Sequence, residues 1–229
     1  SSSKGNCYYI TDGSSPLLLD AGISIREIRQ GIGFSLSSVS GCLVSHSHKD
    51  HCKAVSDLLK TGIDVYMSCE TKDALGVIGH RVKVIEARKQ FKVDDWTVLP
   101  FETQHDCPGS LGFLLANQQG EKLLYLTDSY YCKYKFTGLT HIMIECNHSY
   151  EILEHNVANG SLPVAMKKRL IQSHFSLENV KKFLLANDLS RVKEIWLIHL
   201  SDGNSDAELF KREIQQLTGK PVYVAAERR

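Results

Sequence analysis

The sequence predicts an α+β fold in which two mixed sheets carry helices on their outer faces. Short apolar segments separated by Gly, Asp and Ser fill the first two thirds of the chain, whereas the clearest helical periodicity lies in the last third. The 229 residues are 42% hydrophobic and 23% charged, and no repeat, linker or low-complexity tract divides them. We therefore expect a single domain over residues 1–229, with one sizeable core.

The predicted strands are short apolar runs that turn-forming residues separate. Asp12-Gly13-Ser14-Ser15 and Asn117-Gln118-Gln119-Gly120 have the composition of hairpin connections. Strands are expected at residues 7–11, 16–20, 39–44, 64–67, 82–85, 97–103, 112–117, 122–127, 141–145, 194–199 and 221–225.

The predicted helices show apolar residues at helical spacing, with the strongest pattern near the end of the chain. Ser176 and Ser205 precede two of them and are expected to be their N-caps, because a Ser hydroxyl accepts a hydrogen bond from a free N–H of the first turn. Helices are expected at residues 24–31, 51–60, 71–77, 176–187 and 205–217.

Composition narrows the class of protein. The chain has 27 basic and 26 acidic residues and a formal net charge of +1, so it lacks the strong positive charge of proteins that coat a nucleic-acid duplex. Its seven cysteines are scattered singly without a Cys-X-X-Cys pair, which is typical of reduced thiols in a cytosolic protein. No apolar run approaches the roughly 18 residues of a membrane span, and no signal peptide is evident. We expect a cytoplasmic protein with no membrane partner.

The most informative segment is Ser45-His46-Ser47-His48-Lys49-Asp50-His51, which directly follows the apolar run 39–44. In an extended chain, His46 and His48 point to the same side because their spacing is i, i+2. Imidazole and carboxylate groups together suit Zn²⁺, Mn²⁺ or Fe²⁺. A single His is usually structural, but this combination is rare by chance, so the segment predicts a metal site that includes Asp50 and His51.

Three further apolar strands each lead to a His or an Asp, namely His105, Asp128 and His199. Any one of them alone is more often a structural residue than a ligand. As a set that accompanies the first motif, they indicate ligands held at the ends of strands, where a sheet positions them rigidly.

In this order, the motifs resemble the metallo-β-lactamase superfamily over essentially the whole chain. The resemblance implies an αββα sandwich and a site for two divalent ions, with Zn²⁺ expected and Mn²⁺ as the alternative. The lactamases of the superfamily typically have Cys where this chain has Asp128, so hydrolysis of β-lactams is not expected. The resemblance implies one ion bound by His46, His48 and His105, a second bound by Asp50, His51 and His199, and Asp128 bridging the two.

Two more segments resemble the ribonuclease Z branch of this superfamily. They are Ile142-Met143-Ile144-Glu145-Cys146-Asn147 and Ser173-His174-Phe175-Ser176, although Gly is usual in that branch where this chain has Ser173. The resemblance implies that His174 is a general acid and that Glu145 orients it. Together with Asp50, these two are the expected catalytic residues; the alternative for His174 is a residue that only caps a helix or lies on the surface.

Four segments together most resemble the WalJ/YycJ branch, whose members are regarded as single-domain nucleases that act on DNA ends. They are Ser1-Ser2-Ser3-Lys4-Gly5-Asn6, Asp20-Ala21-Gly22, Glu145-Cys146-Asn147-His148 and His199-Leu200-Ser201. Dimers are common in this family, so a homodimer is possible. Four polar residues near these motifs are expected to bind substrate, namely Ser3, Asn6, His148 and Ser201.

The expected function is a two-metal phosphodiesterase that uses a metal-bridging hydroxide, most simply a nuclease acting on DNA or RNA. The partner is then a nucleic acid or a nucleotide. Basic residues that flank His174 could contact a phosphate backbone or form an ordinary solvated helix face, and aromatic residues that follow Asp128 could stack on a base or pack in a core or dimer interface. These residues are Lys167, Lys168, Arg169, Lys181 and Lys182, and Tyr130, Tyr131, Tyr134 and Phe136.

Three alternatives remain open. One is a phosphodiesterase of cyclic nucleotides or other small cyclic phosphates, as in the PhnP-type enzymes and in phage proteins that destroy such signals. A second is thioester hydrolysis of the glyoxalase type, but the chain after His199 is too short for the helical domain that this activity requires. The third is a non-catalytic interaction module with a structural metal site.

Overall fold

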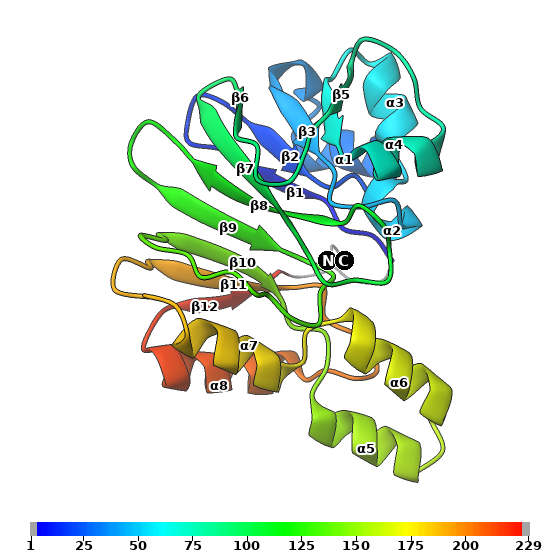
Figure 1. Cartoon of the computed structure of the whole chain (residues 1–229), viewed down its shortest axis with the longest axis vertical. Coiled ribbons are helices and arrows are strands. Elements are labelled where there is room, and N and C mark those ends of the chain that lie inside the picture. Colours follow the sequence, from blue (N-terminus) through cyan, green and yellow to red (C-terminus); the bar gives the residue numbers. More distant parts are fainter. Residues whose placement is uncertain (1–3, 226–229) are drawn as a thin grey trace. The chain divides into compact units, whose positions relative to one another are not determined.

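The computed structural model describes residues 4–225, and its strands form two mixed sheets with flanking helices, as predicted (Figure 1). Ser3, predicted to bind substrate, lies outside the described residues. Within residues 4–225, no helix is long and apolar enough to cross a membrane.

The chain divides into two compact units. The amino-terminal unit contains residues 4–102 and Cys107–Gly120, and the carboxyl-terminal unit contains Thr103–Asp106 and residues 121–225. The expectation of a single domain stays a prediction.

The amino-terminal unit contains a complete five-stranded sheet with the order β1-β2-β3-β4-β5. The first two strands form an antiparallel hairpin across the predicted turn at Asp12–Ser15, and the others are parallel. Strands β2 and β3 are buried along their whole length, which explains their uninterrupted apolar sequences. The strands are β1 (Tyr8–Ile10), β2 (Leu17–Leu19), β3 (Gly41–Leu43), β4 (Val65–Met67) and β5 (Val82–Val84).

Short helices of this unit contribute to a core with β2, β3 and β4 through apolar side chains such as Ile28, Val55 and Leu58. The helix predicted over 51–60 is two helices, because the N–H of Ala54 bonds to the carbonyl of Ala21 (2.8 Å) instead of to the preceding turn. The helices are α1 (Ile25–Gly31), the 3₁₀ helix η1 (Leu36–Ser38), α2 (Lys49–Cys52), α3 (Val55–Lys60) and α4 (Cys69–Leu75).

Three antiparallel strands complete this unit, namely β6 (Phe91–Val93), β7 (Trp96–Glu102) and β8 (Leu111–Ala116). They pack on the five-stranded sheet: the rings of Phe91 and Tyr66 stack at 5.3 Å, and the indole of Trp96 donates to the carbonyl of Ser15 (2.7 Å). The sequence did not predict β6, which is only three residues long.

The carboxyl-terminal unit contains four parallel strands in the order β12-β11-β10-β9. They are β9 (Lys122–Leu126), β10 (His141–Glu145), β11 (Glu194–Ile198) and β12 (Val222–Val224). Glu145 pairs with Ile198 across β10 and β11, and Ile144 pairs with Leu126 across β10 and β9. Since the strands are parallel, residues at their carboxyl ends meet at one edge of the sheet.

Four helices complete the carboxyl-terminal unit, namely α5 (Tyr150–Ala158), α6 (Val164–Ser173), α7 (Leu177–Leu185) and α8 (Ala207–Thr218) (Figure 1). Ser176 caps α7 as predicted. The prediction that Ser205 caps α8 was wrong: the carboxylate of Asp206 accepts from the N–H of Leu209 (2.9 Å), while the Ser205 hydroxyl donates to the carbonyl of Ser201 (2.6 Å).

Candidate metal centre

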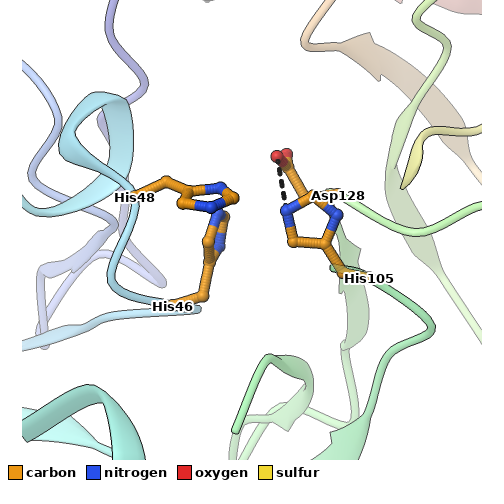
Figure 2. A group of neighbouring side chains, drawn as sticks. All are labelled: His46, His48, His105 and Asp128. Carbon is orange, nitrogen blue, oxygen red and sulfur yellow. Dashed lines mark ion pairs between the residues drawn. The ribbon is translucent and has the colours of Figure 1, made fainter. Parts of the chain in front are cut away.

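In the amino-terminal unit, the predicted ligands lie on the loop that follows β3 and on α2. Figure 2 shows His46 and His48 side by side on this loop, and their ring centroids are 4.7 Å apart. The rings of His46 and His51 are 4.3 Å apart and both side chains are buried. A carboxylate oxygen of Asp50 lies 3.5 Å from Nε2 of His51. All four predicted residues therefore gather at one end of β3.

A buried carboxylate, Asp20, orients these rings. Its Oδ2 accepts a hydrogen bond from Nδ1 of His51 (2.7 Å), and its two oxygens also accept from the backbone N–H and the hydroxyl of Ser45 (2.7 and 3.0 Å). Because the Ser45 hydroxyl donates to Asp20, it accepts from Nδ1 of His46 (3.0 Å). Both imidazoles thus carry their proton on Nδ1 and present Nε2 as the atom that can bind a cation.

Asp20 was not among the residues predicted for the site. The signal was present, since Asp20 comes directly after an apolar strand, as His199 does, and Asp128 comes one residue later after its own strand.

Backbone contacts with Asn6, Ala21 and Gly22 support residues 50 and 51 of this segment. A Cβ atom on Gly22 would lie 1.7 Å from the carbonyl oxygen of Asp50, so only glycine permits this approach. That carbonyl accepts from the N–H of Asn6 (2.8 Å), and the carbonyl of His51 accepts from the N–H of Ala21 (2.7 Å). The amide Nδ2 of Asn6 lies 3.2 Å from Nε2 of His51, which places Asn6 beside a predicted ligand atom; its role in binding substrate stays a prediction.

In the carboxyl-terminal unit, Glu145 at the end of β10 has the corresponding orienting position. It is fully buried, and its Oε1 accepts hydrogen bonds from Nδ1 of His174 (2.6 Å) and from Nδ1 of His199 (2.8 Å). Its Oε2 accepts from the backbone N–H groups of Ser129 and Phe175, both at 3.1 Å. Burial and the nearby Asp128 carboxylate would raise the pKa of Glu145, but the charge of His174 and the hydrogen bonds from His174 and His199 outweigh them and hold the pKa below its usual value.

Asp128 and His105 lie in the same unit and form the ion pair drawn in Figure 2, with 3.6 Å between Oδ2 and Nε2. The other oxygen of Asp128 lies 3.3 Å from Nδ1 of His199 and accepts from the hydroxyl of Thr127 (2.8 Å). Nδ1 of His105 donates to the carbonyl of Ser173 (2.9 Å), which leaves Nε2 as its potential ligand atom. One potential ligand atom from each of Asp128, Glu145, His174 and His199 lies within 4.8 Å of the others.

Three of these residues have an unusual backbone conformation. Asp20 (φ 60°), Asp128 (φ 40°) and His199 (φ 53°) each come after the end of a strand and have a left-handed backbone conformation, which residues other than glycine rarely adopt. Such residues cost about 1–3 kcal/mol each and concentrate at functional sites. All three side chains take part in the hydrogen bonds and ion pairs described above.

His174 ends α6 and is the most exposed member of its cluster, with 18% of its side chain accessible. Burial disfavours its charged form, but the charge and hydrogen bond of Glu145 raise the pKa of His174 above its usual value. A raised pKa favours the protonated imidazole, and an accessible imidazole that holds a proton can act as a general acid.

Two residues predicted to bind substrate have clear positions. His148 is completely buried, whereas Ser201 is half-buried and its hydroxyl accepts from the amide of Asn204 (3.1 Å). Both lie in the carboxyl-terminal unit, and their contact with substrate stays a prediction.

The donor set fits a divalent cation. Four imidazoles have an oxygen partner on Nδ1 and so can present Nε2, and Asp50 and Asp128 supply carboxylate oxygens. This mixture of imidazole and carboxylate suits Zn²⁺ and Mn²⁺ alike. All seven cysteines, which lie within residues 4–225, are free thiols.

A family profile and two relatives of known name all match most of this chain. A family profile of the beta-lactamase superfamily domain matches residues 16–199. The exodeoxyribonuclease WalJ of Streptococcus pneumoniae is 29% identical over 91% of this chain and 82% of its own length. The exodeoxyribonuclease YycJ of Bacillus anthracis is 28% identical over 99% of this chain and 90% of its own.

Among solved structures, the metallo-β-lactamase fold protein YhfI from Bacillus subtilis superimposes with a TM-score of 0.73 at 13% identity, covering 96% of this chain and 88% of that one. This likeness shows the fold, and the family match extends over most of the chain, including the six predicted ligands from His46 to Asp128. The chain therefore belongs to the β-lactamase superfamily and is a hydrolase with the metallo-β-lactamase fold.

Proposed function

We propose that this protein is a metal-dependent phosphodiesterase that hydrolyses DNA. The observation that carries the proposal is the shared carboxylate oxygen of Glu145, which bonds to His199, a predicted metal ligand, and to His174, an accessible imidazole with a raised pKa. This arrangement holds a proton donor next to the ligand cluster, as cleavage of a P–O bond with an alkoxide leaving group requires.

The metal requirement rests on the ligand sets of the two units and on the family. Bound divalent ions, Zn²⁺ or Mn²⁺, would supply an activated water and neutralise charge on the phosphate. The residues proposed to hold them are His46, His48, Asp50 and His51 in one unit and His105, Asp128 and His199 in the other.

The chain's own groups supply the remaining chemistry. Asp20 and Glu145 each hold an imidazole by Nδ1, so the ligand rings are oriented before a cation arrives. In the protonated His174, Nδ1–H donates to Glu145 while Nε2–H faces away from that bond and can be given to the leaving oxygen. The carboxylate then stabilises the imidazolium until the proton moves.

DNA is proposed as the substrate because the two curated relatives, WalJ and YycJ, are both named exodeoxyribonucleases and match this chain nearly end to end. The chain gives no comparable support to cyclic nucleotides, which serve as the competing substrate class in the test below.

The test is a substrate panel with the metal-loaded protein. Linear single- and double-stranded DNA, RNA, cyclic mononucleotides and p-nitrophenyl thymidine phosphate are incubated with Mn²⁺ or Zn²⁺. The expected result is cleavage of DNA, and a loss of about 10²- to 10⁴-fold in that rate for His174→Ala with metal content unchanged. The defect is expected to be much smaller on the p-nitrophenyl ester, because its leaving group needs no proton.

His155→Ala is the matched control, since His155 lies on α5 of the same unit and outside the cluster. Intact DNA under all conditions, faster turnover of cyclic nucleotides than of DNA, or wild-type rates for His174→Ala would each contradict the proposal. Loss of bound metal in His174→Ala would reassign His174 as a ligand.

A further inference from the structure

An aromatic and basic segment follows directly after Asp128 and Ser129. Its sequence is Tyr130-Tyr131-Cys132-Lys133-Tyr134-Lys135, and residues 129–136 contain no acidic residue. Tyr130 and Tyr131 are 39% and 56% exposed, and Lys133 and Lys135 are also exposed. Two large rings that remain open to solvent next to a pair of exposed cations are unusual for packing and are typical of surfaces that bind a polyanion carrying flat rings.

The backbone of this segment is tied along α7. The amide of Asn179 donates to the carbonyl of Tyr130 (3.2 Å), and at the other end the N–H of Phe136 donates to the side-chain oxygen of Asn187 (2.7 Å). Phe136 is buried, and its ring centroid lies 6.3 Å from that of Phe183. The exposed rings therefore project from a fixed backbone, so a ligand that stacks on them loses little conformational entropy.

The segment is also bonded to the ligand cluster of its own unit. Ser129 donates its N–H to Glu145 (3.1 Å) and its hydroxyl to the carbonyl of Tyr131 (2.7 Å). Gln104, the residue before His105, exchanges hydrogen bonds with Ser129 and Tyr130 through its N–H and carbonyl (2.9 and 3.0 Å). A strand that lies on these tyrosines therefore has its next nucleotides beside Asp128 and His105.

We propose that residues 130–135 bind single-stranded nucleic acid, with Tyr131 stacking on a base and Lys133 and Lys135 contacting phosphates. Bases of a duplex are already stacked on one another, so this surface favours a single strand or a frayed end. The inference rests on the proposed function, because it specifies which form of DNA, single strand or duplex, the proposed phosphodiesterase binds.

The experiment measures binding separately from cleavage. Fluorescence anisotropy of the metal-loaded protein is recorded with labelled phosphorothioate oligodeoxythymidine, with the same strand as RNA, and with a blunt DNA duplex. We expect Tyr131→Leu to bind the single DNA strand at least about 5-fold more weakly than wild type, and Tyr131→Phe to bind it like wild type, because stacking needs the ring and not the hydroxyl. Lys133→Gln with Lys135→Gln should reduce the slope of log K against log salt by about 1.4, which is about 0.7 for each lost phosphate contact.

The matched controls change the same residue types elsewhere. Tyr9→Leu removes a ring that is 45% exposed on β1, and Lys60→Gln with Lys92→Gln removes two exposed cations of the amino-terminal unit; both should bind like wild type. Equal binding of Tyr131→Leu and wild type, or equal weakening by the control variants, overturns the inference. Duplex bound as tightly as the single strand also overturns it, and self-association that Tyr131→Leu abolishes would assign the surface to a second copy instead.

Cleavage of unmodified DNA by the wild type is recorded in parallel, so the two proposals fail distinguishably. If the wild type cleaves DNA but Tyr131→Leu binds the single strand as tightly as the wild type does, only the inference fails. If binding depends on Tyr131 but the wild type cleaves no DNA, only the proposed function fails.

Discussion

Replacing Asp20 with Asn tests whether the orientation of His51 controls metal binding. Asp20 accepts hydrogen bonds from the N–H and the hydroxyl of Ser45 and from Nδ1 of His51. An Asn side chain can keep its oxygen on the backbone N–H of Ser45, but its NH₂ group then faces Nδ1 of His51. That contact favours the imidazole tautomer with the proton on Nε2, which blocks the atom that should bind the cation.

The magnitude follows from the bond that is lost. A buried hydrogen bond to a charged group contributes about 1.5–3 kcal/mol. Since about 1.4 kcal/mol corresponds to a factor of ten in an equilibrium constant, the affinity for Zn²⁺ should fall about 10- to 100-fold. This agrees with the usual effect of removing the partner of a metal-bound His.

The affinity is measured by competition with a chromogenic chelator, and the tautomer is read from the ¹⁵N chemical shifts of the His51 ring in the metal-free protein. Asp12→Asn is the control, because Asp12 lies in an exposed turn where its carboxylate accepts from the N–H groups of Ser14 and Ser15, as an Asn oxygen also can. Wild-type affinity for Zn²⁺ in Asp20→Asn, together with a His51 ring that has changed tautomer, would refute the reasoning.

Two further predictions concern the scaffold of each unit. Gly22→Ala places a Cβ 1.7 Å from the carbonyl oxygen of Asp50, so the backbone beside residues 46–51 must shift. We expect the free energy of unfolding, measured by urea denaturation, to fall by roughly 3 kcal/mol or more. The control Gly203→Ala, where a Cβ has open space, should change it by less than about 1 kcal/mol. Burial lowers the pKa of His148 from 6.5 to about 4, so the unfolded chain takes up this proton at a higher pH than the folded protein does, and the folded state loses stability as the pH falls from about 6.5 toward 4. Between pH 7 and pH 4, the free energy of unfolding of His148→Leu should therefore fall by up to about 3 kcal/mol less than that of the wild type. Identical acid unfolding curves for the two proteins would contradict this.

Sequence patterns predicted the sheet strands well because most of them are buried, and burial is what an apolar run reports. They missed α5 and α6, because these helices bury only Leu153 and Ser173, respectively, and expose Val164 and Met166, so no apolar stripe reveals them. They also merged α2 with α3, since the division depends on a hydrogen bond from Ala54 to Ala21, which lies 33 residues earlier and leaves no local signal.

The candidate site shows the same limit. Its predicted ligands could be named because His and Asp at strand ends form a pattern along the chain, and the roles predicted for Glu145 and His174 came from family resemblance. Asp20 was missed although it has that same pattern, because a lone Asp after a strand resembles an ordinary turn residue. The tyrosines after Asp128 were visible in the sequence, but their exposure depends on how the segment is tied to α7.

The left-handed backbone at Asp20, Asp128 and His199 has a consequence for engineering this protein. Glycine at any of the three positions would relieve the local strain, but it would also remove a side chain to which buried neighbours are bonded. The strain released is of the same size as the hydrogen bonds lost, about 1–3 kcal/mol in each case, so glycine at these strand ends should bring no net gain in stability. Variants selected for heat resistance should therefore carry their substitutions elsewhere in the chain.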